Sequence, residues 1–351
     1  MRSSTEQGFA DRARLRARET LILTRRDVVA ALPLEDCIRS VEEALEHHAA
    51  GRSIPPSVLG IASVDGGFHL KAAGLKLERT WFAVKCNANF PLNRERFALP
   101  TIQGLILLCD GDDGTPLAVM DSAEITTLRT AAATAVAAKH LARRDARIAT
   151  IAGCGVQGRA QLRALACVRP LDRVFAYDRD EALARAFAED MSAETGLEVE
   201  PVAELGAAAR RSDICVTCTP VTRYILDADD VSAGTFVAGV GADSESKWEI
   251  DPQLFARARV VVDSLEQCAS IGDLHHALDH RTITRDRVHA ELPDLVSGRK
   301  SGRESEDEIT LFDSTGIALE DVGAALTVYR RAIERGLGSR VEFAAQARVG
   351  D

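Results

Sequence analysis

Aromatic residues are scarce in this chain, because its 11 Phe, 3 Tyr and 2 Trp amount to only 5 % of 351 residues. A core is still expected, since 46 % of the residues are hydrophobic, and it must consist mainly of Ala, Val, Leu and Ile. Positive charge is not in excess either. The formal net charge of −10 disfavours nucleic acids and anionic membranes as partners, because both need a basic surface.

Long apolar runs are also missing. No stretch reaches the roughly 18 apolar residues that a membrane-spanning helix needs. The first 20 residues mix arginines with Glu6, Asp11 and Glu19 and contain no apolar segment, which argues against a secretory signal. We expect residues 1–18 to form a disordered tail. The chain length fits two domains of roughly 100–200 residues each.

The eight cysteines are scattered and form no array of metal-ligand spacing. Cys215 and Cys218 make a C-x-x-C, but they lie in the apolar run 214–218 and have no second pair. We therefore expect buried structural thiols, no metal site, and a cytoplasmic location in which thiols stay reduced.

The arrangement of hydrophobic residues changes near residue 147. Before it, the sequence predicts a short strand and a turn over 20–31, an amphipathic helix over 34–48, five strands between 58 and 120, and an alanine-rich helix that follows Asp121. After it, strands and helices alternate, with strands at 147–152, 173–177, 214–219, 235–240 and 260–262. Such alternation is typical of βαβ units and predicts an α/β fold with a doubly wound parallel sheet.

A glycine motif follows the first strand of this second part. Residues 153–158 read Gly-Cys-Gly-Val-Gln-Gly, which is G-x-G-x-x-G between a predicted strand and a predicted helix. In that setting the glycines permit a tight turn, close approach of a pyrophosphate and helix–strand packing. Asp178 ends the next strand, where a carboxylate binds ribose hydroxyls of NAD. Arg179 is next to Asp178 and partly offsets the repulsion between that carboxylate and the 2′-phosphate of NADP, so NADP stays an alternative cofactor.

Further blocks extend over nearly the whole chain. They are residues 84–87, 90–93, 99–101, 116–121, 128–132, 241–243 with Lys247, 262–264, 302–304 and 309–316. With the glycine motif they resemble the ornithine cyclodeaminase/mu-crystallin family, and within it the archaeal-type alanine dehydrogenases. The resemblance implies a homodimer with a Rossmann domain over 126–314. It also implies an α+β substrate and dimerisation domain built from 19–125 and 315–351.

The resemblance also implies roles for individual residues. Asp243 is expected to be the catalytic acid/base, and Lys85 and Arg129 are expected to approach the substrate carboxylate. The expected catalytic residues are Asp243 and Lys85, and the expected substrate-binding residues are His69, Lys71, Lys85, Arg129 and Thr315. The expected cofactor-binding residues are Thr101, Arg129, Gly153, Gly155, Val156, Gln157, Gly158, Asp178, Arg179, Thr217, Thr219, Val240 and Lys247. The chemistry agrees, because an amino or imino acid needs cations for its carboxylate and a group that moves the amine proton.

One segment departs from the family pattern. Family members commonly carry a Met-Pro-Ala-like block before the lysine strand, whereas this chain has Lys71 at the Met position and His69 two residues earlier. A basic residue that relatives carry upstream is absent near Ser57 and Val58. Because His69 and Lys71 alternate in a strand, both face the same side, and we expect Lys71 to take over the carboxylate contact.

Three functions remain open from the sequence. The first is an NAD(P)-dependent amino-acid dehydrogenase or cyclic-imine reductase, for example on alanine or Δ1-pyrroline-2-carboxylate. The second is an ornithine or lysine cyclodeaminase that uses NAD catalytically. The third is a non-enzymatic ligand-binding protein like some mu-crystallin relatives, which the presence of Lys85, Arg129 and Asp243 disfavours.

Overall fold

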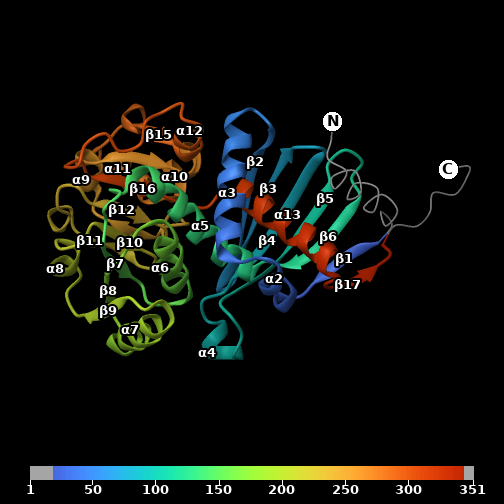
Figure 1. The fold of residues 1–351 in the computed structure, drawn as a ribbon, viewed down its shortest axis with the longest axis horizontal. Coiled ribbons are helices and arrows are strands. Elements are labelled where there is room, and N and C mark those ends of the chain that lie inside the picture. Colours follow the sequence, from blue (N-terminus) through green and yellow to red (C-terminus); the bar gives the residue numbers. More distant parts are fainter. Residues whose placement is uncertain (1–18, 344–351) are drawn as a thin grey trace, which may run out of the picture. The chain divides into compact units, whose positions relative to one another are not determined.

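The computed structural model describes residues 19–343, so the expected tail at 1–18 lies outside the described residues (Figure 1). The described chain divides into two compact units. The first unit consists of residues 19–33, 52–126 and 321–343, and the second consists of residues 34–51 and 127–320. The domain boundaries expected from the sequence stay a prediction.

The first unit is built on a seven-stranded sheet with the strand order β17-β1-β6-β5-β4-β3-β2. Strands β2 to β6 follow one another as antiparallel neighbours, and β1 pairs parallel with β6. The strands are β1 (Thr20–Leu23), β2 (Ser53–Ser63), β3 (Gly66–Lys76), β4 (Thr80–Asn89), β5 (Ile102–Asp110), β6 (Pro116–Asp121) and β17 (Ser339–Val341). The expected strands are present, and most are longer than the sequence indicated.

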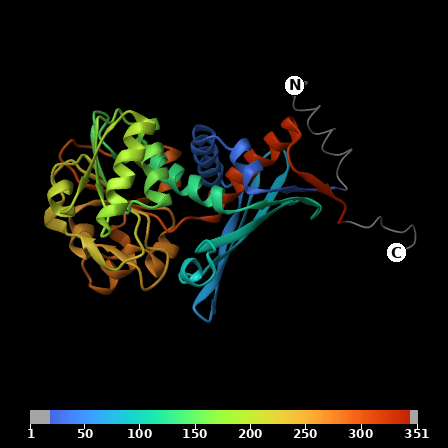
Figure 2. The same ribbon diagram turned by 90° about the horizontal axis from the view of Figure 1, so that it is seen from below.

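One face of this sheet is covered by a helix. The long helix α13 (Ala318–Arg335) runs along it from Asp321 onward (Figure 2). The Tyr329 ring of this helix lies 6.0 Å from the Trp81 ring of β4. On the other face, large apolar side chains of β2, β3 and β5 are exposed. They are Leu59, Ile61, Phe68, Leu105 and Leu107, and we call this set the outer apolar face.

Two short helices complete the first unit, α2 (Arg25–Ala31) and α4 (Asn93–Phe97). A turn was expected at the position of α2, and that expectation is wrong. Thr24 and Asp27 form a reciprocal capping box, in which each side chain accepts a hydrogen bond from the other residue's backbone N–H. This cap satisfies N–H groups at the helix start and allows a short helix to form.

The second unit contains an eight-stranded parallel sheet with the strand order β15-β14-β16-β12-β10-β7-β8-β9. The strands are β7 (Ile148–Ala152), β8 (Arg173–Tyr177), β9 (Glu198–Val202), β10 (Ile214–Thr217), β12 (Phe236–Gly239), β14 (Arg259–Val262), β15 (Ala290–Glu291) and β16 (Thr310–Asp313). The strand order reverses between β7 and β10. In doubly wound sheets, ligands bind at the carboxyl ends of the strands at such a reversal.

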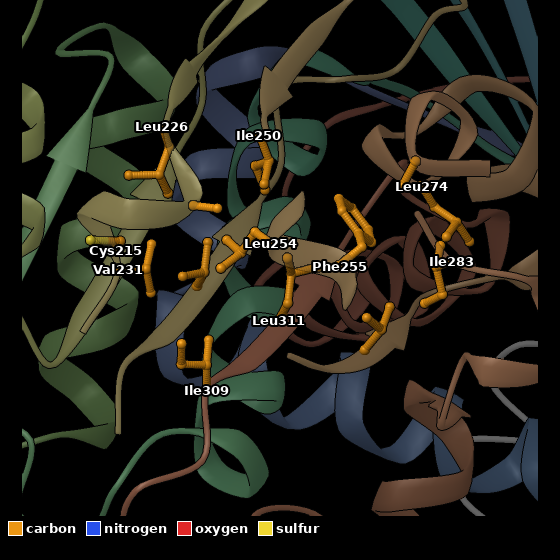
Figure 3. Packing of buried hydrophobic residues seen from close by; sticks show 14 of the residues in the cluster. Cys215, Leu226, Val231, Ile250, Leu254, Phe255, Leu274, Ile283, Ile309 and Leu311 are labelled. Carbon is orange, nitrogen blue, oxygen red and sulfur yellow. The ribbon is translucent and has the colours of Figure 1, made fainter. Parts of the chain in front are cut away.

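Helices and short elements surround this sheet. They are α3 (Leu34–Ala49), α5 (Ala123–Leu141), α6 (Val156–Val168), α7 (Glu181–Thr195), α8 (Leu205–Ala209), α9 (Pro252–Arg257), α10 (Leu265–Ile271), α11 (Asp273–Asp279), α12 (Leu292–Val296), the 3-10 turns Ala228–Asp230 and Arg285–Arg287, and the strand pair β11 (Thr222–Leu226) and β13 (Trp248–Ile250). Apolar side chains from β10, β13, α9, α11 and β16 form one buried cluster that includes Cys215, Ile250, Phe255 and Leu311 (Figure 3). Burial of this cluster stabilises the sheet that positions the loops described below.

Among the described residues, no helix is long and apolar enough to cross a membrane. Cys215 is a buried thiol, and burial raises its pKa to about 12. Cys218 is only partly buried, and its thiol donates to the backbone oxygens of Ala152 and Gly153 at 3.4 and 3.3 Å.

Candidate functional site

The glycine loop between β7 and α6 leaves room for a phosphate. Gly153 has φ +106°, a left-handed conformation, and a Cβ there would lie 2.8 Å from the Cys218 carbonyl oxygen. A Cβ on Gly158 would overlap the Gly153 carbonyl oxygen, so only glycine allows α6 to start this close to the loop. A Cβ on Gly155, the N-cap of α6, would meet nothing within 4 Å. The space beside Gly155 is therefore open at the start of α6, where the first N–H groups of a helix can bind the pyrophosphate of a dinucleotide.

Asp178 connects the next strand to this loop. It follows β8, and its Oδ2 accepts a hydrogen bond from the Cys154 N–H at 2.9 Å, while its Oδ1 accepts from the Asp180 N–H at 3.0 Å. Arg179 beside it is exposed. A half-buried carboxylate at this place fits ribose hydroxyls and disfavours a 2′-phosphate.

Glu249 ties together the loops that follow β10 and β12. Its carboxylate accepts from the Thr217 hydroxyl at 3.0 Å, from the Thr219 N–H and hydroxyl at 2.6 and 2.7 Å, and from the Gly241 N–H at 2.7 Å. Burial raises the pKa of Glu249, while these hydrogen bonds act in the opposite direction. The Val240 N–H donates to the Thr217 carbonyl at 2.9 Å, so both loops keep one geometry.

Asp243 lies in the loop after β12, and Lys247 lies at the end of the same loop. The Lys247 Nζ is 2.5 Å from the Asp243 carboxylate. The Lys247 carbonyl in turn lies 2.9 Å from the His276 Nε2, and burial lowers the pKa of His276. Asp243 is therefore a partly exposed carboxylate beside a cation, on a loop anchored by α11. Such a group can give or take a proton.

Arg129 of α5 is buried in the second unit. Its Nη1 donates to Glu320 at 2.8 Å, and Gly316 faces the guanidinium so closely that any Cβ there would collide with it. Thr315 is next to Gly316, and its hydroxyl donates to Asp263 at 3.2 Å and accepts from Gln267 at 2.8 Å. Arg129 is thus charged, oriented and closely packed against the loop that follows β16.

In the first unit, Lys71 and Lys85 lie directly opposite each other on β3 and β4. Both are buried, and the Lys85 Nζ lies 2.8 Å from both oxygens of Asp321 on α13. His69 pairs with Asn87 one step along the same face. Thr101 lies just before β5, and its carbonyl accepts from the Phe90 N–H at 2.9 Å.

Several buried acids were not singled out from the sequence. Glu320 and Asp321 stand between the apolar residues 317–319 and 322–326, and that interruption was an available signal. Glu249, Asp273 and Asp313 gave no signal, because their burial depends on strands far apart in the chain. Burial raises the pKa of Asp313 to about 7, and burial with the neighbouring acids raises that of Asp273 well above its usual range. The roles expected for individual residues stay predictions.

Comparisons with known proteins identify the family of this chain. The profile of the ornithine cyclodeaminase/mu-crystallin family matches residues 18–336. An alanine dehydrogenase of Archaeoglobus fulgidus is 36 % identical over 93 % of this chain and 99 % of its own length.

Solved structures extend the similarity to the fold. The Δ1-pyrroline-2-carboxylate reductase of Thermococcus litoralis, solved with NADH and L-proline, has a TM-score of 0.88 at 34 % identity, over 92 % of this chain and 100 % of that one. An archaeal alanine dehydrogenase dimer with bound NAD has a TM-score of 0.89 at 35 % identity, over 93 % of this chain and 100 % of that one. The iminosuccinate reductase of Paracoccus denitrificans with NAD⁺ has 0.84 at 30 %, also over 93 % and 100 %. Because the profile and these relatives span nearly its whole length, this chain belongs to the ornithine cyclodeaminase/mu-crystallin family.

Proposed function

We propose that this protein is an NAD-dependent oxidoreductase that acts on the C–N bond of a small amino acid or imino acid, with NADP as the alternative cofactor. The observation that carries the proposal is the glycine loop, in which Gly158 packs against the Gly153 carbonyl and Asp178 holds the Cys154 N–H. The similarity to reductases and dehydrogenases solved with NAD or NADH supports the same cofactor here.

In the proposed reaction, a few side chains bind the substrate and transfer its proton. When bound, the nicotinamide supplies or accepts the hydride at the carbon that carries the nitrogen. The Asp243 carboxyl gives the nitrogen its proton during reduction and removes it during oxidation. Lys85 and Arg129 bind the substrate carboxylate, and their ion pairs with Asp321 and Glu320 orient the two cations.

We propose that the protein acts as a homodimer and that the outer apolar face is covered by a second copy. Five large apolar side chains on one sheet face are more than scattered surface residues and mark an interaction surface. The similar archaeal alanine dehydrogenase was solved as a dimer, which supports a copy of this chain as the occupant. The cytoplasmic location stays a prediction.

The function is tested by following NADH and NADPH oxidation with candidate substrates. Pyruvate or oxaloacetate with ammonium, and Δ1-pyrroline-2-carboxylate, test the reductase, and we expect stoichiometric NADH oxidation with at least one imine. Ornithine and lysine with a trace of NAD test the cyclodeaminase, for which ammonia would accumulate without net NADH. Binding of NADH without turnover of any of these compounds would contradict the proposal and favour a non-enzymatic ligand-binding protein.

A further inference from the structure

Two lysines occupy directly opposed positions on the covered face of the sheet in the first unit. Lys71 of β3 pairs in register with Lys85 of β4, and their side chains are only 8 % and 3 % exposed. Directly opposed residues have Cβ atoms about 5 Å apart, and like charges in such a pair destabilise a sheet. Burial adds to this cost, because an ammonium group loses its hydration. Two ammonium groups at directly opposed positions on one sheet face can together bind a ligand that carries two negative charges.

The other positions of this row across the sheet are apolar. In register across the sheet, Val58 of β2 lies opposite Lys71, while Ile106 of β5 lies opposite Lys85 and Met120 of β6 follows. Both oxygens of the Asp321 carboxylate lie 2.8 Å from the Lys85 Nζ. This carboxylate offsets the charge of Lys85, and Lys71 adds a second buried ammonium to the same face.

The next row of the same face provides polar groups and space. It runs Gly60, His69, Asn87 and Gly104 across β2 to β5. A Cβ on Gly60 would meet nothing within 4 Å, so there is open space beside His69. Asn87 is held in place, because its Oδ1 accepts from the Ser122 hydroxyl at 2.5 Å. Two rows of this face thus present two ammonium groups, an imidazole and a fixed amide beside unfilled space.

We infer that the substrate is an α-imino or α-amino dicarboxylate, in which Lys85 binds the α-carboxylate and Lys71 binds the second carboxylate. This inference rests on the proposed function, and the change at the C–N bond is the same. An ammonium group is a compact point charge that binds a carboxylate without requiring bidentate geometry. The similar iminosuccinate reductase of Paracoccus denitrificans acts on a compound of this class, which supports the assignment.

The test compares a dicarboxylic and a monocarboxylic substrate on the same enzyme. NADH oxidation is measured with oxaloacetate plus ammonium and with pyruvate plus ammonium, for the wild type and for Lys71→Met, Lys71→Arg and the control Lys76→Met. Lys76 is exposed at the end of the same strand. We expect the wild type to prefer oxaloacetate. We expect Lys71→Met to lower the ratio of the two kcat/KM values about tenfold or more, because a buried carboxylate then loses its charged partner. In Lys71→Arg the ratio of the two kcat/KM values should fall less than in Lys71→Met. In Lys76→Met the ratio should equal that of the wild type.

The outcomes separate this inference from the proposed function. Equal losses on both substrates in Lys71→Met would overturn it, since Lys71 would then bind the shared α-carboxylate or act through folding. A wild type that reduces the pyruvate-derived imine and not the oxaloacetate-derived one would also overturn it, while the proposed function stands. If NADH binds, as seen by its fluorescence, and no imine is reduced, the proposed function itself fails. Thermal unfolding of each variant shows whether it folds, and Lys71→Arg carries the test if Lys71→Met does not.

Discussion

Glu249 holds Thr219 by two hydrogen bonds to one oxygen, since its Oε1 accepts from the Thr219 backbone N–H at 2.6 Å and from the hydroxyl at 2.7 Å. Its other oxygen accepts from the Thr217 hydroxyl and the Gly241 N–H. One buried side chain therefore sets the relative position of two loops at the carboxyl edge of the parallel sheet. Thr219 and Val240, which are expected along the cofactor, lie in these loops.

The first prediction follows from that relationship. Glu249→Gln keeps the shape but places an NH₂ group against backbone N–H donors, and one unsatisfied buried polar group costs about 1–3 kcal/mol. We expect the Kd for NADH to rise about tenfold, because about 1.4 kcal/mol corresponds to that factor. Fluorescence titration measures it, and Glu245→Gln, an exposed position on the same loop, should bind NADH like the wild type. An unchanged Kd in Glu249→Gln would show that the Glu249 hydrogen bonds do not shape the cofactor site.

The second prediction concerns the choice between NAD and NADP. Asp178 is a carboxylate whose two oxygens accept backbone N–H groups, so it stays in place beside the glycine loop. The wild type should favour NADH, and Asp178→Ser should lower the ratio of kcat/KM for NADH over NADPH about tenfold, because repulsion of the 2′-phosphate is removed. Asp172→Ser, an exposed position just before β8, is the control. A wild type that clearly prefers NADPH would refute this role.

The third prediction concerns proton transfer. Asp243→Asn should lower kcat about a hundredfold or more, a loss typical of a missing general acid–base group. The Kd for NADH should change little, because the phosphates are expected at residues 153–158. Asp229→Asn alters a side chain that is 94 % exposed and should leave kcat unchanged. Near-wild-type kcat in Asp243→Asn, measured with the best substrate found, would reduce Asp243 to a residue that only holds Lys247.

The fourth prediction concerns assembly. A charge at Leu105 or Leu107 would be buried against the second copy, and an unpaired buried charge is costly. We expect the double variant Leu105→Glu with Leu107→Glu to be monomeric at micromolar concentration, where the wild type is a dimer by light scattering. Val29→Glu, at an equally exposed position on α2, should remain dimeric. A monomeric wild type would contradict the proposed homodimer.

The fifth prediction concerns stability against pH. Burial raises the pKa of Asp313 from 3.8 to about 7, with Asp263 adding to the shift and the N–H groups of Asp273 and Leu274 opposing it. The folded protein thus keeps a proton that the unfolded chain releases above its ordinary pKa. The stabilisation is present at low pH and is lost as pH rises through about 7.

Asp313→Asn cannot ionise, so its thermal midpoint should fall less than that of the wild type between pH 5 and pH 8. The exposed Asp307→Asn should follow the wild type. A wild-type minus Asp313→Asn difference that stays constant over this range would contradict the raised pKa.

The glycine loop could be predicted from the sequence because its requirements are local. A strand, a turn that needs φ above zero and a helix start are encoded within residues 147–158, and the structure has β7, Gly153 at φ +106° and α6 there. The doubly wound sheet was predictable for the same reason, because each βα unit has its own local pattern of hydrophobic residues, and the structure confirms it. Alternation likewise predicted that His69 and Lys71 share a face.

The partners of those residues were decided by tertiary structure. That Lys85 lies opposite Lys71 depends on the register of β3 against β4, and that Asp321 meets Lys85 depends on how α13 packs, 236 residues further along the chain. The buried acids Glu249 and Asp313 look like ordinary polar residues in the sequence. Their raised pKa values arise only when distant strands exclude water around them, because desolvation is a property of the packed environment and not of the neighbouring residues in the chain.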